Sequence, residues 1–109
     1  MYSMCDTKIL SQRGDTHISV CHKCRTYYIW QQSFVLTFTQ NKFFDFLNII
    51  KSNGDELFFS TFPDGEFRLI MKTPYPDIVF SFDEEQWQNF RDALQESYYM
   101  NEVYGMLNN

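Results

Sequence analysis

Glycine and proline are scarce in this chain, with four and three residues among 109. A phosphate-binding loop needs closely spaced glycines, and the four present are scattered, so the sequence contains neither a P-loop nor a dinucleotide-binding fingerprint. It also lacks the G-x-S-x-G turn of serine hydrolases and the H-x-E and P-C-x-x-C motifs of zinc deaminases. The absence of a catalytic set favours a domain that is not an enzyme.

Long apolar runs and basic side chains are also few. The longest apolar run, residues 27–30, falls far short of the roughly 20 residues that cross a membrane as a helix. Residues 1–25 carry four basic and two acidic side chains, whereas residues 26–109 carry five basic and 12 acidic ones. Because an acidic surface repels phosphate groups, we expect neither a nucleic acid nor a membrane as a partner.

Cysteine is rare too, but its three residues form the one pattern with a chemical interpretation. Cys21 and Cys24 make a Cys-x-x-Cys motif, a spacing that suits a zinc knuckle or a redox pair. Residues 8–12 and 16–21 have strand character and flank Gly14, which predicts a hairpin. A two-residue turn there would set Lys8 opposite Cys21 and would return Cys5 to the position opposite Cys24.

The cysteines leave three interpretations open. The first is a structural zinc held by Cys5, Cys21 and Cys24, with His22 as the candidate fourth ligand. The second is a set of thiols without metal. The third, redox chemistry, needs Cys21 at the start of a helix, whereas residues 26–30 have the composition of a strand. Residues 1–6 lack the pattern of a signal peptide, so we expect a cytoplasmic protein, in which disulfides are rare.

The first half of the chain predicts further strands and a helix. Residues 26–30 and 34–38 are rich in β-branched and aromatic side chains. Thr39 is a candidate N-cap for a helix over residues 40–52, and Asn53-Gly54 is its stop signal. The apolar side chains of this helix recur at the helical period. They are Phe43, Phe46, Leu47 and Ile50.

The second half predicts a hairpin, a strand and a helix. Residues 57–62 and 66–72 flank a turn at Pro63-Asp64-Gly65, and residues 77–82 form a further strand. Ser81 with Glu84 matches a capping box that opens the last helix. Gly105 weakens the end of that helix, so residues 105–109 are expected to fray. Two apolar sets are predicted to face the core. They are Phe67, Leu69 and Met71 in the hairpin, and Trp87, Phe90, Leu94 and Tyr98 in the helix.

Together these elements predict one α+β domain over residues 1–109, an antiparallel sheet built from hairpins with two helices packed on it. The cysteine-bearing, zinc-ribbon-like hairpin occupies residues 1–31, and the helix, hairpin, strand and helix follow in residues 32–109. Aromatic residues number 21, more than one small core readily buries. Tyr27, Tyr28 and Trp30 occupy both faces of one strand. We therefore expect contact with another protein, most simply in a homodimer.

The order of these motifs resembles a family of small uncharacterised bacterial proteins, a domain of unknown function. The similarity rests on Cys5, on Cys21-x-x-Cys24 at the end of an alternating strand, and on residues 35–39 leading into an aromatic helix. The chain departs from the pattern at Gln31-Gln32, where relatives often carry a Phe-Gly pair. The resemblance supports the fold and the grouping of the cysteines, and it implies no activity.

Three functions are compatible with the sequence. The first is a non-enzymatic protein-interaction module with a structural cysteine cluster. The second is a small thiol- or metal-dependent enzyme that uses Cys21 and Cys24. The third is a protein that binds an apolar small molecule between the sheet and the first helix, where aromatic side chains would line the site.

Overall fold

The computed structural model describes residues 6–51 and 57–107. Cys5 and the stop signal Asn53-Gly54 lie outside these residues. The predicted α+β class is confirmed, and the strands divide into two antiparallel sheets rather than one. The first sheet contains β1 (Lys8–Arg13), β2 (Thr16–Cys21), β3 (Thr26–Trp30) and β4 (Val35–Thr39), in that order. The second contains β5 (Leu57–Thr61), β6 (Phe67–Lys72) and β7 (Val79–Phe82).

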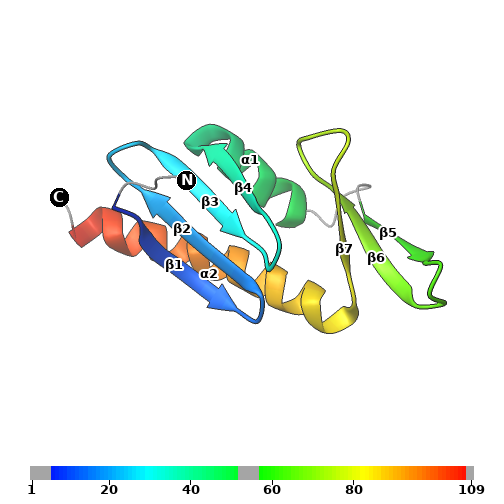
Figure 1. Ribbon diagram of the computed structural model, residues 1–109. Helices are drawn as coiled ribbons and strands as arrows, with labels where there is room; N and C mark the ends of the chain where they lie inside the picture. The colour runs from blue at the N-terminus through cyan, green and yellow to red at the C-terminus, as the bar shows by residue number, and fades with distance from the viewer. Residues whose placement is uncertain (1–5, 52–56, 108–109) are drawn as a thin grey trace.

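Two helices connect and cover the sheets. The helix α1 (Gln40–Lys51) follows β4, and α2 (Glu84–Leu107) follows β7. Both lie against the same face of the first sheet, α2 behind β1 and β2 and α1 behind β4 (Figure 1). At about 1.5 Å per residue, the 24 residues of α2 extend about 36 Å, enough to reach from the first sheet to β6 and β7. One core therefore runs through both sheets, with Met71, Phe80 and Phe82 joining the residues of the first sheet.

The pairing of β1 with β2 differs from the expected register. Gln12 lies opposite His17, as a two-residue turn requires. A bulge near Leu10 shifts the pairs farther from the turn by one residue. Lys8 therefore lies opposite Val20, and the prediction that it faces Cys21 is wrong. The bulge lets both Leu10 and Ser11 point toward α2, where Leu10 is buried and the Ser11 hydroxyl donates to the carbonyl oxygen of Ala93 at 2.6 Å.

The first helix forms as its sequence predicts. The Thr39 hydroxyl accepts the backbone N–H of Lys42 at 3.3 Å, which satisfies one of the unpaired donors of the first turn. All four residues of the apolar face, Phe43, Phe46, Leu47 and Ile50, are buried. Phe43 stacks on Tyr27 of β3 with ring centroids 4.4 Å apart, so α1 packs directly on the first sheet.

The start and the buried face of α2 differ in detail from expectation. Asp83, not Ser81, caps the helix: its carboxylate accepts the N–H of Gln86 at 2.7 Å, and its own N–H donates to the Gln86 side chain at 3.0 Å. Ser81 is held in β7 opposite Ile70. Ser97 is fully buried and Tyr98 is 40% exposed, so the predicted stripe is wrong at Tyr98. The helix also continues through Gly105 to Leu107.

The second sheet also carries apolar side chains outside the part that packs on the core. Leu69 and Met71 are buried as predicted, but Phe67 on the same face is exposed. Ile70, on the opposite face, is nearly buried. The residues of β6 therefore alternate only in part between an apolar face and a solvent-exposed face. Phe67 is the first residue of β6, and β5 is the outermost strand on this side of the molecule (Figure 1).

Candidate functional site

The cysteine motif forms the turn between β2 and β3. Cys21 ends β2 with its side chain fully buried, and Cys24 lies exposed in the turn. The backbone N–H of Cys24 donates to Sγ of Cys21 at 3.3 Å. Arg25 completes the turn with φ of 55°, a left-handed conformation that is uncommon for a residue with a side chain. The turn therefore brings the N–H of one cysteine to the sulfur of the other.

The side chain of His22 lies toward α2. Its ring contacts that of Tyr104 edge to face, with centroids 6.5 Å apart. The ammonium of Lys8 lies 5.1 Å from the centre of the same tyrosine ring. Cys21 belongs to the opposite face of β2, because side chains alternate along a strand and Val20 faces the core. His22 and Cys21 therefore start on different sides of the sheet.

Within residues 6–51 and 57–107, no three Cys, His, Asp or Glu side chains form a group that could hold a metal ion. Cys5, the third predicted ligand, lies outside these ranges. Cys21 and Cys24 adjoin each other in one turn, whereas His22 contacts Tyr104. Zinc binding by Cys5, Cys21, Cys24 and His22 therefore stays a prediction.

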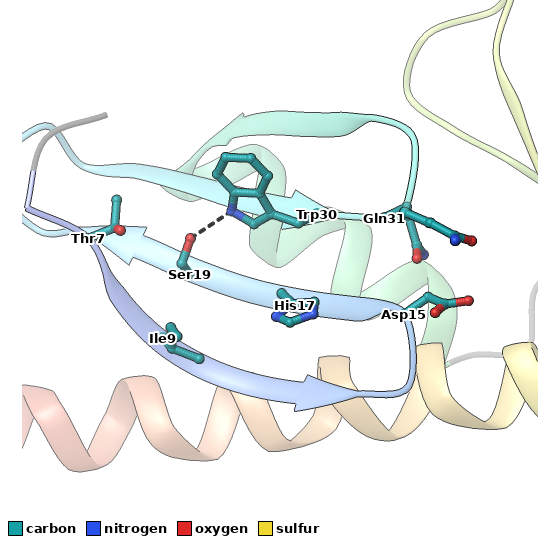
Figure 2. A pocket seen from close by; sticks show the side chains of 8 residues that line it. Thr7, Ile9, Asp15, His17, Ser19, Trp30 and Gln31 are labelled. Atoms are coloured by element: carbon teal, nitrogen blue, oxygen red, sulfur yellow. Dashed lines mark hydrogen bonds between the residues drawn. The ribbon is translucent and has the colours of Figure 1, made fainter. Parts of the chain in front are cut away.

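A shallow groove lies on the face of the first sheet that points away from the helices (Figure 2). Its volume is about 510 Å³. The indole N–H of Trp30 donates to the hydroxyl of Ser19 at 3.1 Å, which fixes the tryptophan ring across β2 and β3. His17 and Ile9 project beside this pair. The groove therefore combines one ring surface with several polar side chains.

One end of the groove contains an amide donor without a partner. The hydroxyl of Thr16 donates to Oε1 of Gln31 at 3.2 Å, and Nε2 of Gln31 is buried and unpaired. Gln31 and Asp15 also line a second, smaller cavity beside β7. Because an unpaired buried donor costs free energy, this corner between the two sheets is the least well satisfied polar region of the described chain.

Exposed aromatic side chains gather at the outer end of the second sheet. Phe58 is 49% exposed, Phe59 62% and Phe67 63%. The rings of Phe59 and Phe67 stack with centroids 5.2 Å apart. We call these three residues the apolar edge. Among the described elements β5 contacts only β6, so neither helix covers Phe58 or Phe59.

The backbone of β5 also has one unpaired side. The N–H of Phe62 donates to the carbonyl oxygen of Glu66, across the turn to β6. Since successive residues of a strand point their backbone groups in opposite directions, Ser60 bonds toward β6, whereas Phe59 and Thr61 present N–H and C=O outward. No strand of the described chain lies on that side. Such an edge accepts another strand readily.

These residues were not predicted as a site from the sequence. The uncovered aromatic side chains were expected at Tyr27, Tyr28 and Trp30, but Tyr27 and Tyr28 are buried. A signal was present, because Phe58 and Phe59 are consecutive in a strand and must point to opposite faces. In a strand at the end of a small sheet, at least one of these faces is uncovered.

Neither helix in the described part of the chain is both long and apolar enough to cross a membrane. Comparisons of the chain with protein-family models, with curated proteins and with solved structures found no match.

Proposed function

We propose that this chain is a non-enzymatic protein-interaction domain that pairs with a second copy of itself through the open edge of β5. The observation that carries the proposal is the coincidence, on one strand, of exposed phenylalanines and a backbone side that faces no other strand of the described residues. β5 contains no charged residue, proline or glycine. Charged side chains and prolines are the features with which proteins normally block strand pairing at a sheet edge.

A second copy fits this edge by symmetry. Antiparallel pairing of two β5 strands centred on Phe59 sets the outward N–H and C=O of each Phe59 against those of the other copy. The two Phe59 rings then become cross-strand neighbours on one face, about 5 Å apart at Cβ. Each already stacks on Phe67 of its own chain, so four rings form a continuous row across the interface.

Charge permits this arrangement despite the net charge of -5. β5 itself is neutral, and Asp64 in the adjoining turn is paired with Arg68 at 2.8 Å. In the antiparallel arrangement the two Asp64 residues lie at opposite ends of the interface. At about 3.3 Å per residue their separation is roughly 30 Å, well beyond the screening length of about 8 Å at physiological salt.

The area available indicates a weak dimer. With about 150–250 Å² per aromatic side chain, the exposed parts of the three phenylalanines amount to about 350 Å². A stable interface buries about 800 Å² on each partner, and the strand backbone with its flanking polar side chains has to supply the rest. We therefore expect dissociation in the micromolar range, on the order of other interfaces of small size.

The cysteine turn has a structural role in this proposal. Cys21, Cys24 and His22 are the described residues of the predicted zinc site, and Cys5 lies outside the described ranges. A structural zinc would fix the turn between β2 and β3 at the end of the first sheet, remote from β5. Elemental analysis should then give about one zinc per chain, and Cys24→Ser should lose it. Protein purified without chelators that contains no zinc would contradict this role.

One observation favours the alternative of a thiol-dependent enzyme. The N–H of Cys24 donates to the sulfur of Cys21, and such a bond would stabilise a nucleophilic thiolate if one formed there. The side chain of Cys21 is fully buried, however, so a substrate would reach only Cys24 without a rearrangement. Titration of the thiols distinguishes the two functions: a thiolate reactive near pH 6 supports the enzyme, and thiols inert at that pH support the interaction domain.

Sedimentation equilibrium over about 1–200 µM tests the dimer. The expected mass rises from that of the 13.2 kDa chain toward twice that value. Phe59→Lys should remain monomeric at all concentrations, because a lysine at the edge opposes strand pairing. Tyr99→Lys is the matched control: Tyr99 is 66% exposed on α2, far from β5, and its replacement should leave the association unchanged.

Two results would contradict the proposal. One is a monomer at 200 µM with no dependence on concentration. The other is a dimer that Phe59→Lys leaves intact while Tyr99→Lys dissociates it, because the interface would then lie on α2.

A further inference from the structure

A cavity of about 420 Å³ lies at one end of the first sheet, where three elements meet. The turn between β2 and β3, the first residue of α1 and the last turns of α2 come together there (Figure 1). The volume is within the usual range for small-molecule sites. The cavity contains no residue of the apolar edge, so a ligand bound in it would not depend on the dimer.

The cavity contains an arginine whose charge is not neutralised by the protein. Arg25 lines the cavity, and within the part of the chain that the structure describes its side chain makes no hydrogen bond or ion pair. Two other arginines are paired, Arg13 with Glu96 at 2.7 Å and Arg68 with Asp64 at 2.8 Å. The guanidinium of Arg25 is therefore available to a ligand.

Three further side chains supply hydrogen-bond donors. The hydroxyl of Tyr27 donates to Oδ1 of Asn101 at 3.0 Å, so the amide nitrogen of Asn101 is the end that remains for a ligand. Gln40, the first residue of α1, adds a second amide. His22 carries at least one ring N–H in either protonation state. The cavity is therefore rich in donors.

None of the described residues that line the cavity is acidic, although the chain as a whole carries a net charge of -5. Glu102, which follows Asn101 in α2, lines a different cavity together with Phe44 and Tyr98. Asp6, which precedes β1, does not line the cavity either. Donors and a positive charge without a competing carboxylate favour an anionic ligand.

The placement of the donors indicates which anion fits. Arg25, Gln40 and Asn101 belong to a turn and two different helices, so they approach the cavity from different directions. The oxygens of a carboxylate lie in one plane, whereas a phosphate group presents three oxygens in a tetrahedral arrangement and carries about -1.5 to -2 charges at pH 7. Arginine also binds phosphate oxygens through two parallel N–H groups. This donor set therefore suits a phosphate better than a carboxylate.

We propose that the cavity binds a phosphate group, with the guanidinium of Arg25 and the amides of Gln40 and Asn101 as donors. At about 30 Å³ for each water-sized group, its volume holds about 14 such groups, enough for a phosphate with a small organic substituent. The site also gives a role to an arginine at a backbone φ of 55°, a conformation that glycine adopts more easily.

Titration of the protein followed by NMR tests the proposal with three probes, inorganic phosphate, methyl phosphate and acetate. The titrations are run at about pH 7.5 and constant ionic strength, because exposed charges are screened by salt. Phosphate should shift the side-chain amide signals of Gln40 and Asn101 along a saturating curve. Acetate should need about three-fold higher concentration, since it carries less charge. Methyl phosphate that binds as well as phosphate would assign an organic phosphate, and weaker binding would assign the free ion.

Variants at two positions locate the site. Arg25→Gln should weaken phosphate binding about ten-fold, the factor expected for a hydrogen bond to a charged group. Lys23→Gln is the matched control, because Lys23 is an exposed cation of the same turn that does not line the cavity, and it should change binding less than about two-fold. Asn101→Asp keeps an oxygen for the Tyr27 hydroxyl but replaces the amide donor with a negative charge, so it should remove binding.

Arg25→Gly separates binding from stability. It should weaken phosphate binding as much as Arg25→Gln does, yet raise the melting temperature by about 2–4 °C, because glycine relieves the left-handed backbone. Circular dichroism of each variant confirms that it is folded. A lower melting temperature together with unchanged phosphate binding would show that Arg25 serves the turn and not a ligand.

Three other results would overturn the proposal. One is the absence of saturable shifts up to about 50 mM phosphate. Another is an equal loss in Lys23→Gln and Arg25→Gln, which would indicate a general attraction to the basic end of the chain. The third is acetate binding as tight as phosphate binding, which would contradict a site built for a tetrahedral anion.

Discussion

The rings of Phe59 and Phe67 are stacked 5° from parallel, although more than half of each side chain is exposed. The stacked pair of Tyr27 and Phe43, by contrast, is buried between the first sheet and α1. The exposed pair is therefore ordered like a core contact at a place where no described element covers it. The protein therefore has a covered aromatic cluster around α1 and an uncovered one at the apolar edge.

The covered cluster should dominate the stability of the domain. Phe46 is buried and contacts the rings of Phe38, Phe80 and Phe90. Phe46→Ala should lower the free energy of unfolding by about 3–5 kcal/mol, through lost burial and the cavity that remains. Ile49→Ala, on the same helix but 44% exposed, should cost clearly less, about 1 kcal/mol. Urea denaturation measures both, and equal costs would contradict the assigned core.

The N-terminus of α2 gives a prediction that separates two candidate caps. Asp83→Ala removes the carboxylate that accepts the N–H of Gln86, keeps the backbone N–H that donates to the Gln86 side chain, and should destabilise the protein by about 1 kcal/mol. Ser81→Ala leaves the cap intact and should change stability by less than about 0.5 kcal/mol. Thermal melts of the two variants decide between them. A larger loss in Ser81→Ala would restore the capping box that the sequence suggests.

Stability above pH 10 should depend on Tyr27. Burial raises the pKa of its hydroxyl above the usual value of 10.0, and the hydroxyl donates to Asn101 of α2 at 3.0 Å. The folded chain holds this proton more tightly than the unfolded chain. Its contribution to stability is therefore complete below about pH 10 and is lost as the pH rises through the raised pKa.

Tyr27→Phe isolates this contribution. At pH 7 the variant should be less stable by about 1 kcal/mol, because it lacks the bond to Asn101. Between pH 10 and 11.5 its stability should fall less steeply than that of the parent, so that the difference narrows. Urea denaturation at a series of pH values provides the comparison. If the free energies of unfolding of the parent and the variant change in parallel with pH, Tyr27 has no such role.

The turn between β1 and β2 should require glycine at position 14. Gly14 has φ of 54°, and a Cβ atom there would lie 2.4 Å from Nδ2 of Asn89 in α2. Gly14→Ala should cost about 1–2 kcal/mol from the left-handed backbone alone, and more if Asn89 cannot move. Adding Asn89→Ala should recover only the steric part. A Gly14→Ala variant as stable as the parent would show that the turn adopts another conformation.

Local signals in the sequence predicted much of the fold. The N-cap at Thr39 and the apolar face of α1 depend on residues within a few positions of one another, and both are confirmed. The shift at Leu10 was not predictable in this way, because it satisfies contacts with α2 more than 80 residues later in the chain. The choice of Asp83 over Ser81 likewise depends on β7 extending to Phe82 before the helix begins.

The candidate sites could be predicted from the sequence less completely than the fold. The turn at Cys21 and Cys24 was expected between two strands, and the structure has it there. The direction of His22 depends on Tyr104 at the far end of α2, which no local pattern specifies. The surplus of aromatics was recognised, but which of them remain uncovered depends on where α2 ends its contact with the second sheet.

Amide hydrogen exchange along β5 tests the proposed pairing most directly. The outward N–H groups of Phe59 and Thr61 should exchange quickly at about 1 µM and become protected at about 200 µM, while Ile70 in the central strand β6 stays protected at both. In Phe59→Lys the Thr61 amide should exchange quickly at both concentrations. Exchange at Phe59 and Thr61 that is equally fast at 1 and 200 µM in the parent protein would contradict self-association through β5.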